Sequence, residues 1–223
     1  MLNRGLIVSC QAGEGEPLHG LGIMRYMARA AKAGGATGIR ALYYDVNDIK
    51  EEVPDLPVIG LVKQVYADSP IYITPTIKEV DSVLATKAEV VALDATLRVR
   101  PNGETLDEIV NYIRKTAPDR EIMADIATIE EAVNAEKLGF DYISTTLRGY
   151  TDETKGATLP DIDFMREVAA TVKKSKVICE GGVYELAEIE KINEINPYAV
   201  VIGSAITRPA LITKRFNSYL KLK

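Results

Sequence analysis

The chain contains a single histidine, His19, among its 223 residues, and this scarcity removes several kinds of active site. It excludes a metal centre with several imidazole ligands. It also leaves Cys10 without an evident histidine partner, so we expect that thiol to be buried rather than nucleophilic. Carboxylates alone can hold Mg²⁺, but the sequence shows no cluster of them. We therefore expect no metal site, and we expect His19 to pack or cap within the first helix.

Long apolar runs and targeting signals are also missing. No run approaches the ~20 apolar residues of a membrane-spanning helix, and the first residues lack the features of a signal peptide. The two cysteines lie far apart in the sequence, which is typical of free thiols in a reducing compartment. The net charge of −5 argues against a nucleic-acid partner. We expect a soluble cytoplasmic protein that binds neither membranes nor nucleic acid.

What the sequence does contain is a series of short apolar runs, and nearly every one ends in a polar, charged or glycine residue. The eight runs cover residues 6–11, 38–41, 58–63, 90–96, 121–128, 141–146, 177–182 and 199–209. Helical segments separate them, as in successive βαβ units. Eight such units close a barrel more naturally than they form an open sheet, and the first turn lacks a dinucleotide-binding G-x-G-x-x-G. The sequence therefore predicts a single-domain (β/α)8 TIM barrel over residues 1–223.

Five of the intervening helices can be recognised from their apolar spacing and end signals. We expect them within residues 17–35, 103–118, 128–140, 161–175 and 186–196. Pro17 marks the start of the first, and Thr128 with Glu131 suits a capping box at the third. Residues 64–76 do not fit the alternation, because they are too long for a simple loop between a strand and its helix. We interpret them as an excursion of the active site.

Two charged residues at strand ends predict the chemistry. Lys63 ends the third run, and Glu180 lies at the end of the seventh, directly before its two glycines. In an eight-stranded barrel these strands lie four apart, so the two side chains face each other across the carboxyl-terminal mouth, where barrel enzymes react. A small ligand between them is approached on both faces. This geometry suits an epimerase, which removes a proton from one face of a carbon and returns one to the other face.

The protonation state of Lys63 is open at this stage. It acts as a base only if its pKa falls well below the ordinary value of about 10.4, and burial with a neighbouring cation such as Arg40 has that effect. If the pKa does not fall, the ammonium stabilises an enolate while Glu180 handles the proton. Two other readings use the same barrel: a Schiff-base aldolase with Lys63 as nucleophile, and a phosphosugar-binding module without catalysis.

Small residues after the last two strands predict a phosphate site. Gly181 and Gly182 follow the seventh strand, and Gly203 and Ser204 follow the eighth. Small residues let backbone N–H groups approach anionic oxygens closely, and barrel enzymes often bind phosphate at this place. Arg208 adds a bidentate donor for the same anion.

Three further polar residues follow other strands. We predict that Gln11 and Asp125 form hydrogen bonds to the ligand, although an aspartate in this place equally suits a helix cap. The role of Asp94 stays open.

These residues resemble those of the N-acetylmannosamine-6-phosphate 2-epimerases of bacterial sialic-acid catabolism. The matching motifs extend over essentially the whole chain: "GLIVSCQA", "EPLH", "PVIGLVK", "IYITPT", "VALDAT", "MADIAT", "EKLGFDYISTTLRGYT", "VICEGG" and "AITRPALITKRF". Such enzymes are (β/α)8 barrels that interconvert N-acetylmannosamine 6-phosphate and N-acetylglucosamine 6-phosphate. The resemblance adds the N-acetyl group and the reacting carbon C2, whose proton is acidic only in the open-chain sugar.

The resemblance also implies roles for individual residues. Lys63 and Glu180 are the implied catalytic pair, working without a metal or another cofactor, and the implied assembly is a homodimer. The sugar contacts that it implies are Gln11, Arg40 and Asp125, and the phosphate contacts are Gly181, Gly182, Gly203, Ser204 and Arg208. The chain departs from the usual family pattern beside these residues, at Gln64, Val65, Gly20, Leu21, Ser204 and the segment 184–189.

Overall fold

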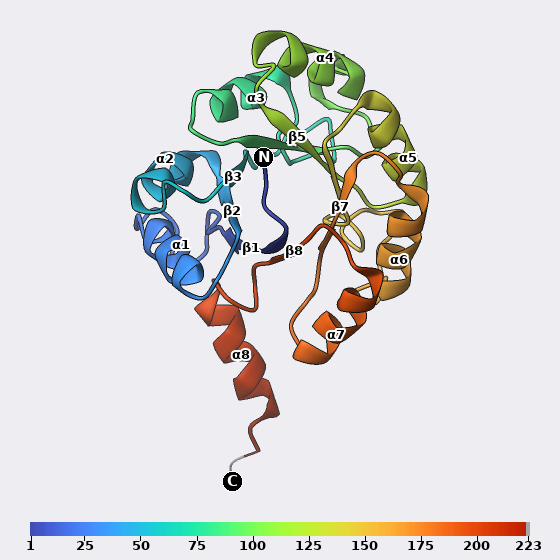
Figure 1. Ribbon diagram of the computed structural model, residues 1–223. Coiled ribbons are helices and arrows are strands. Elements are labelled where there is room, and N and C mark those ends of the chain that lie inside the picture. Colours follow the sequence, from blue (N-terminus) through green and yellow to red (C-terminus); the bar gives the residue numbers. More distant parts are fainter. Residues whose placement is uncertain (222–223) are drawn as a thin grey trace.

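The computed structural model describes residues 1–221, which form a closed barrel of parallel strands (Figure 1). Each strand pairs with the next in sequence, and the last pairs with the first. The strands are β1 (Gly5–Cys10), β2 (Gly38–Leu42), β3 (Val58–Leu61), β4 (Val90–Asp94), β5 (Glu121–Asp125), β6 (Tyr142–Ser144), β7 (Lys176–Glu180) and β8 (Ala199–Ile202). All eight predicted runs therefore contain strands, and the predicted TIM-barrel fold is confirmed.

Helices alternate with the strands, as the sequence predicts. They are α1 (Met24–Ala33), α2 (Tyr43–Glu52), α3 (Ile77–Leu84), α4 (Leu106–Thr116), α5 (Ile129–Leu138), α6 (Ile162–Thr171), α7 (Leu186–Ile195) and α8 (Pro209–Tyr219). Helices α1 to α7 surround the barrel, whereas α8 leads away from it (Figure 1). None of the helices in the described part of the chain has the length and apolarity needed to cross a membrane.

The first helix is shorter than the sequence predicts. Residues 17–23 form turns, and α1 begins only after them. The cause is the backbone of Gly20 and Gly22, whose φ angles of 69° and 62° are incompatible with a right-handed helix. The expectation that His19 lies in this helix is therefore wrong. His19 lies in the loop before it, with Nδ1 3.0 Å from the carbonyl oxygen of Ala12.

The other four predicted helices are present, with ends close to those expected. At α5 the predicted capping box is formed: Thr128 N donates to Glu131 Oε2 at 2.9 Å, and Glu131 N donates to Thr128 Oγ1 at 3.3 Å. This capping box follows β5 closely, so it fixes where the chain turns from the strand into α5 at the barrel mouth.

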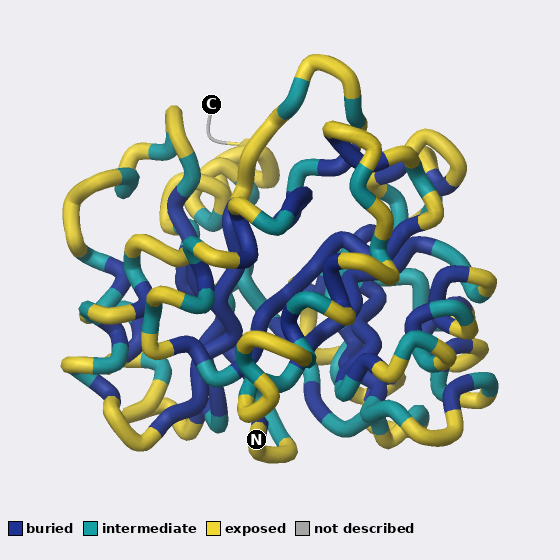
Figure 2. Tube along the Cα trace, turned by 90° about the horizontal axis from the view of Figure 1, so that it is seen from above, coloured by how far each residue is buried: buried dark blue, intermediate teal, exposed yellow. Residues whose placement is uncertain are grey.

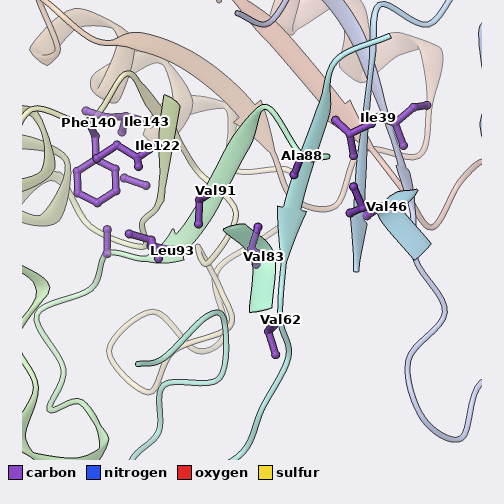
Figure 3. Close-up of a cluster of buried hydrophobic side chains, with 14 of the residues drawn as sticks. Ile39, Val46, Val62, Val83, Ala88, Val91, Leu93, Ile122, Phe140 and Ile143 are labelled. Carbon is purple, nitrogen blue, oxygen red and sulfur yellow. The ribbon is translucent and has the colours of Figure 1, made fainter. Parts of the chain in front are cut away.

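Apolar side chains fill two concentric layers. The outer layer packs the strands against the helices, and Figure 3 shows part of it around Ile39, Val83 and Val91. The inner layer fills the barrel with side chains such as Ile59 and Met123. Strands β2, β3 and β4 are buried at every position because both of their faces are covered. Figure 2 shows the resulting buried centre within an exposed shell.

The amino-terminal end of the barrel is closed by the start of the chain. Tyr142 Oη accepts a hydrogen bond from Leu2 N at 2.9 Å, and Tyr198 Oη donates to Leu2 O at 2.6 Å. The opposite end carries the excursion predicted between β3 and α3, which folds back on itself: Thr74 N donates to Val62 O at 2.8 Å. The molecule therefore has one closed end and one polar mouth.

Candidate active site

A cavity of about 200 Å³ lies at the carboxyl ends of the strands. Nine of the ten predicted site residues line it: Gln11, Arg40, Lys63, Glu180, Gly181, Gly182, Gly203, Ser204 and Arg208. The tenth, Asp125, is not among the lining residues, because it is fully buried behind the guanidinium of Arg40. The lining residues come from both sides of the mouth, so the barrel brings together residues that are far apart in sequence.

Arg40 is the central charge of the site and only 1% exposed. Its Nη1 and Nη2 donate to the two carboxylate oxygens of Asp125 at 2.9 and 2.6 Å, and Nη1 also donates to Glu180 Oε2 at 2.6 Å. Burial lowers the pKa of Arg40, but the two carboxylates outweigh it and hold that pKa above its ordinary value. Arg40 is therefore a permanent cation shared by two acids.

Glu180 is held at both its backbone and its side chain. Thr145 Oγ1 donates to Glu180 O at 2.7 Å and accepts from Glu180 N at 3.0 Å, which fixes the end of β7. The carboxylate is mostly buried. Burial and the nearby charge of Asp125 raise the pKa of Glu180 above its ordinary value, although Arg40 opposes them. Glu180 thus retains a proton to higher pH than a free glutamate does.

Lys63 lies two residues beyond the end of β3, and its Nζ has no hydrogen bond or ion pair within residues 1–221. Crowding by the surrounding protein lowers the pKa of Lys63, and the cations Arg208 and Arg40 lower it further. The residue nevertheless keeps an exposed surface, so water still screens its charge while the cavity is open.

The predicted phosphate residues form one wall. Gly181 and Gly182 have φ angles of 115° and 72°, and a Cβ on Gly182 would lie 2.5 Å from Leu159 Cβ. Glycine is therefore required at this turn. Arg208 precedes α8 and forms an ion pair with Glu16, with Nη2 3.1 Å from Oε1. The guanidinium of Arg208 is therefore held in place by a carboxylate.

Sequence reasoning missed several lining residues. Thr146, Tyr72, Tyr150 and Tyr184 all face the cavity. The sequence could have indicated Thr146, because it is the last residue of the sixth run. It therefore stands at a strand end, as the predicted site residues do. Tyr72 and Tyr150 come from long loops and Tyr184 from the short loop after β7, and no periodicity reveals the course of these loops.

The open question about Asp94 has a structural answer. Its side chain is fully buried, accepts from Thr96 N at 3.0 Å and forms an ion pair with Arg98 at 2.7 Å. It neither lines the cavity nor caps a helix. Asp94 instead organises the loop that follows β4.

The two thiols are buried and unpaired. Burial raises the pKa of both Cys10 and Cys179 to about 12, so neither is an activated nucleophile. Among residues 1–221, no three His, Cys, Asp or Glu side chains are grouped as ligands for a metal ion.

Comparison with known proteins gives one consistent result. A family model described as "Putative N-acetylmannosamine-6-phosphate epimerase" matches residues 24–222. A Staphylococcus carnosus protein is 55% identical over 219 residues, covering 97% of this chain and 96% of its own length. A Clostridium perfringens protein is 53% identical over 217 residues, with the same coverage. Both carry the name "Putative N-acetylmannosamine-6-phosphate 2-epimerase".

Solved structures agree. The structure of the N-acetylmannosamine-6-phosphate 2-epimerase from Clostridium perfringens superposes with a TM-score of 0.91 at 51% identity, covering 96% of this chain and 93% of that one. A thiamine phosphate pyrophosphorylase from Pyrococcus furiosus superposes with a TM-score of 0.62 at 18% identity, covering 98% of this chain and 97% of that one. At that identity the second likeness shows the barrel fold alone.

Proposed function

Because the chain belongs to the N-acetylmannosamine-6-phosphate epimerase family, we propose that its barrel mouth interconverts N-acetylmannosamine 6-phosphate and N-acetylglucosamine 6-phosphate. The observation that carries the proposal is the placement of Lys63 and Glu180 in one cavity, at strands four apart in the closed barrel. A carbon held between them is open to proton removal on one face and to proton return on the other.

The pKa directions of the two groups suit this task. The pKa of Lys63 is lowered and that of Glu180 is raised, so the two groups approach each other in proton affinity. General acid–base catalysis works best when both groups can gain and lose a proton near the working pH. When the C2–H bond breaks, its electron pair enters an enolate on the open-chain sugar, and the buried Arg40 cation stabilises that negative charge.

The rest of the cavity fits the other parts of the substrate. The glycine turn after β7 and Arg208 offer a site for the 6-phosphate. Gln11 lines the same cavity and can donate to and accept from the sugar hydroxyls or the N-acetyl group.

Exchange of the C2 proton tests the proposal directly. N-acetylmannosamine 6-phosphate is incubated with the protein in D₂O, and the C2 signal and the product are followed by proton NMR. We expect conversion by the wild-type protein and a loss of at least about 10²-fold in Lys63→Ala and Glu180→Gln. Lys78→Ala and Glu190→Gln, which alter exposed residues outside the cavity, serve as matched controls.

The outcomes separate the alternatives. Binding of the sugar phosphate without any conversion in the wild type would identify a binding module and refute the epimerase. A covalent adduct trapped by borohydride at Lys63 would identify a Schiff-base reaction instead. Full activity in either active-site variant would remove that residue from its role.

Two features of the structure, the helix α8 and an apolar groove, support our proposal that the protein is a homodimer. No side chain of α8 is buried within the described chain, and Phe216 is 66% exposed. Ile212, Phe216 and Tyr219 recur at helical spacing and form an apolar stripe, in which Phe216 and Tyr219 are exposed and Ile212 is half-buried. An apolar groove of about 590 Å³ lies where an eighth barrel helix would cover the outer faces of β8 and β1. Its apolar lining includes Leu6, Leu186, Ile189, Val200, Ile202 and Ile206.

We propose that α8 of a second copy fills this groove and that the exchange is reciprocal, as two-fold symmetry requires. Light scattering on the eluting protein measures the mass. We expect a dimer for the wild type and a monomer for Phe216→Asp, because a charge in the stripe cannot be buried without a partner. Ser218→Asp adds the same charge on the other side of α8 and should leave the dimer intact. A dimeric Phe216→Asp variant would show that this groove is not the interface.

We also place the reaction in the cytoplasm. Two buried, unpaired thiols fit a reducing compartment. Fractionation of cells that express the full chain, with activity assayed in each fraction, tests this placement; activity confined to the membrane or exported fraction would contradict it.

A further inference from the structure

The two oxygens of the Glu180 carboxylate have different surroundings. Oε2 accepts from Arg40 Nη1 at 2.6 Å, and it lies 3.1 Å from Thr146 Oγ1 and 3.4 Å from Ser144 Oγ. Oε1 accepts no hydrogen bond within residues 1–221. Glu180 lines the cavity, and only one of its two carboxylate oxygens is hydrogen-bonded within residues 1–221.

We propose that Thr146 is a positioning residue that holds Glu180 Oε2 against Arg40, so that Oε1 is the oxygen that exchanges the proton with C2 of the substrate. This inference rests on the proposed function. Thr146 follows β6, whose last residue pairs with Ile178 in β7 close to Glu180, so its hydroxyl approaches the carboxylate from the neighbouring strand.

The hydroxyl of Thr146 has one hydrogen and three acceptors within reach: two carboxylates and Ser144 Oγ, which lies 2.9 Å away. Its Oγ1 lies 2.6 Å from Asp125 Oδ1 and 3.1 Å from Glu180 Oε2, and it accepts from Arg40 Nη1 at 3.2 Å. While Glu180 is charged, the hydroxyl can donate to Oε2. When a proton from C2 reaches Oε1, Oε2 becomes a neutral carbonyl oxygen, and the hydroxyl turns to Asp125. The C–H electron pair stays on the sugar, and the reverse rotation accompanies return of the proton.

Rotation of one hydroxyl therefore matches the hydrogen bonding of the site to each protonation state of Glu180. Hydrogen bonds to ionised groups are the stronger ones, so the donor favours whichever carboxylate carries charge. A valine in place of Thr146 keeps the shape of the side chain and removes the hydroxyl, both as a donor to the two carboxylates and as an acceptor from Arg40.

Other charges around Glu180 stay the same in such a variant. The ionisable groups that face it are Arg40 from β2, Lys63 from the loop after β3, Asp125 from β5 and Tyr150 from the loop after β6. None of these charged groups is replaced in the variant, although Arg40 and Asp125 each lose a hydrogen bond to the hydroxyl. A change in the titration of Glu180 then reports the loss of the Thr146 hydroxyl.

The experiment compares Thr146→Val with Thr146→Ser and with Thr151→Val. Thr151 lies in the same loop, and its buried hydroxyl contacts Thr154 at 2.9 Å, away from the cavity. The pH–rate profile is measured for each, with the limb that belongs to Glu180 identified from Glu180→Asp. The carboxyl carbon of Glu180 is titrated by NMR in ¹³C-glutamate-labelled protein and assigned by its absence in Glu180→Gln.

We expect Thr146→Val to raise the pKa of Glu180 by about one pH unit, the size of one hydrogen bond to a charged group. We expect kcat to fall about tenfold with KM nearly unchanged, since the hydroxyl acts through Glu180 rather than on the sugar. Thr146→Ser, which keeps a donor, should restore both values, and Thr151→Val should match the wild type.

An unchanged Glu180 titration in Thr146→Val, or a shift that Thr146→Ser does not reverse, would overturn the inference. The NMR titration does not require turnover. A protein whose Glu180 responds as expected but which shows no epimerisation would contradict the proposed function alone.

Discussion

The two sides of the barrel mouth hold their reactive groups in opposite ways. On one side, Glu180 belongs to a network that joins β2, β5, β6 and β7 through Arg40, Asp125 and Thr146. On the other, Lys63 stands beyond the end of β3 with no polar contact to Nζ in the described chain and an exposed surface. The side chain of Glu180 is therefore fixed before a ligand binds, whereas that of Lys63 can change its contacts when a ligand binds.

This difference assigns separate tasks to the two sides. The proton affinity of Glu180 is set by buried neighbours before any substrate arrives. That of Lys63 depends on what fills the cavity, because water screens it now and the cation Arg208 is shared with Glu16. A phosphate that takes Arg208 from Glu16 changes the charges around Lys63. Negative charge bound at Arg208 therefore offsets the lowering of the Lys63 pKa by that cation.

The largest effect should come from breaking the prearranged side. Arg40→Met leaves two carboxyl groups buried together without a cation, and we expect a loss of about 3–5 kcal/mol in the free energy of unfolding. Buried carboxyl groups without a cation bind protons more tightly in the folded chain than in the unfolded one. The loss should therefore grow as the pH rises above about 4.5 and shrink in acid. Urea denaturation at pH 5 and pH 8 measures both.

Arg29→Met supplies the control for Arg40→Met. Arg29 forms an exposed ion pair with Glu52 at 2.9 Å, and removing such a pair costs about 1 kcal/mol or less. Equal losses in the two variants would show that the network does not stabilise the fold and would remove the contrast between the two sides.

Replacing Lys63 should have a smaller effect, of opposite sign, on the free energy of unfolding. The pKa of Lys63 is lowered from 10.5 in the folded chain, so the unfolded chain binds more protons between the lowered value and 10.5. The free energy of unfolding therefore rises with pH across that window, and below it Lys63 costs stability. We expect Lys63→Met to stabilise the fold at pH 7 by less than about 1 kcal/mol, because exposure to water limits the effect.

Thermal unfolding at pH 7 and pH 10 measures this gain. Lys78→Met, at an exposed position of α3, is the control and should change neither midpoint. If Lys63→Met unfolds at a lower temperature than the wild type at pH 7, Lys63 is a structural contact rather than a responsive group.

Strand ends could be predicted from the sequence because a barrel converts sequence order into position. Lys63 and Glu180 were placed opposite each other by counting strands, and both line the cavity. The capping box at Thr128 was likewise predictable, since its residues are local neighbours.

Features that depend on contacts between residues far apart in the chain could not be predicted from the sequence. The start of α1 was misplaced because the pattern of apolar residues continues through Gly20 and Gly22, whose backbone does not. Asp125 was predicted as a ligand contact from its strand end, whereas its carboxylate is turned to Arg40, 85 positions away. The departure of α8 from the barrel could not be predicted from local periodicity. An apolar stripe on a helix is expected whether the helix packs on its own barrel or on another molecule.

The triad of Arg40, Asp125 and Glu180 bears on how the chain folds. It joins residues 85 and 140 positions apart, and contacts of such long range form late because long loops must close first. A half barrel ending after β4 would hold Arg40 without Asp125 and Glu180, and the remaining half would hold these two acids without Arg40. Neither half is a favourable resting point, so these buried charges favour all-or-none closure of the barrel. Recombining half barrels from different proteins should succeed only where this charge triad is completed across the junction.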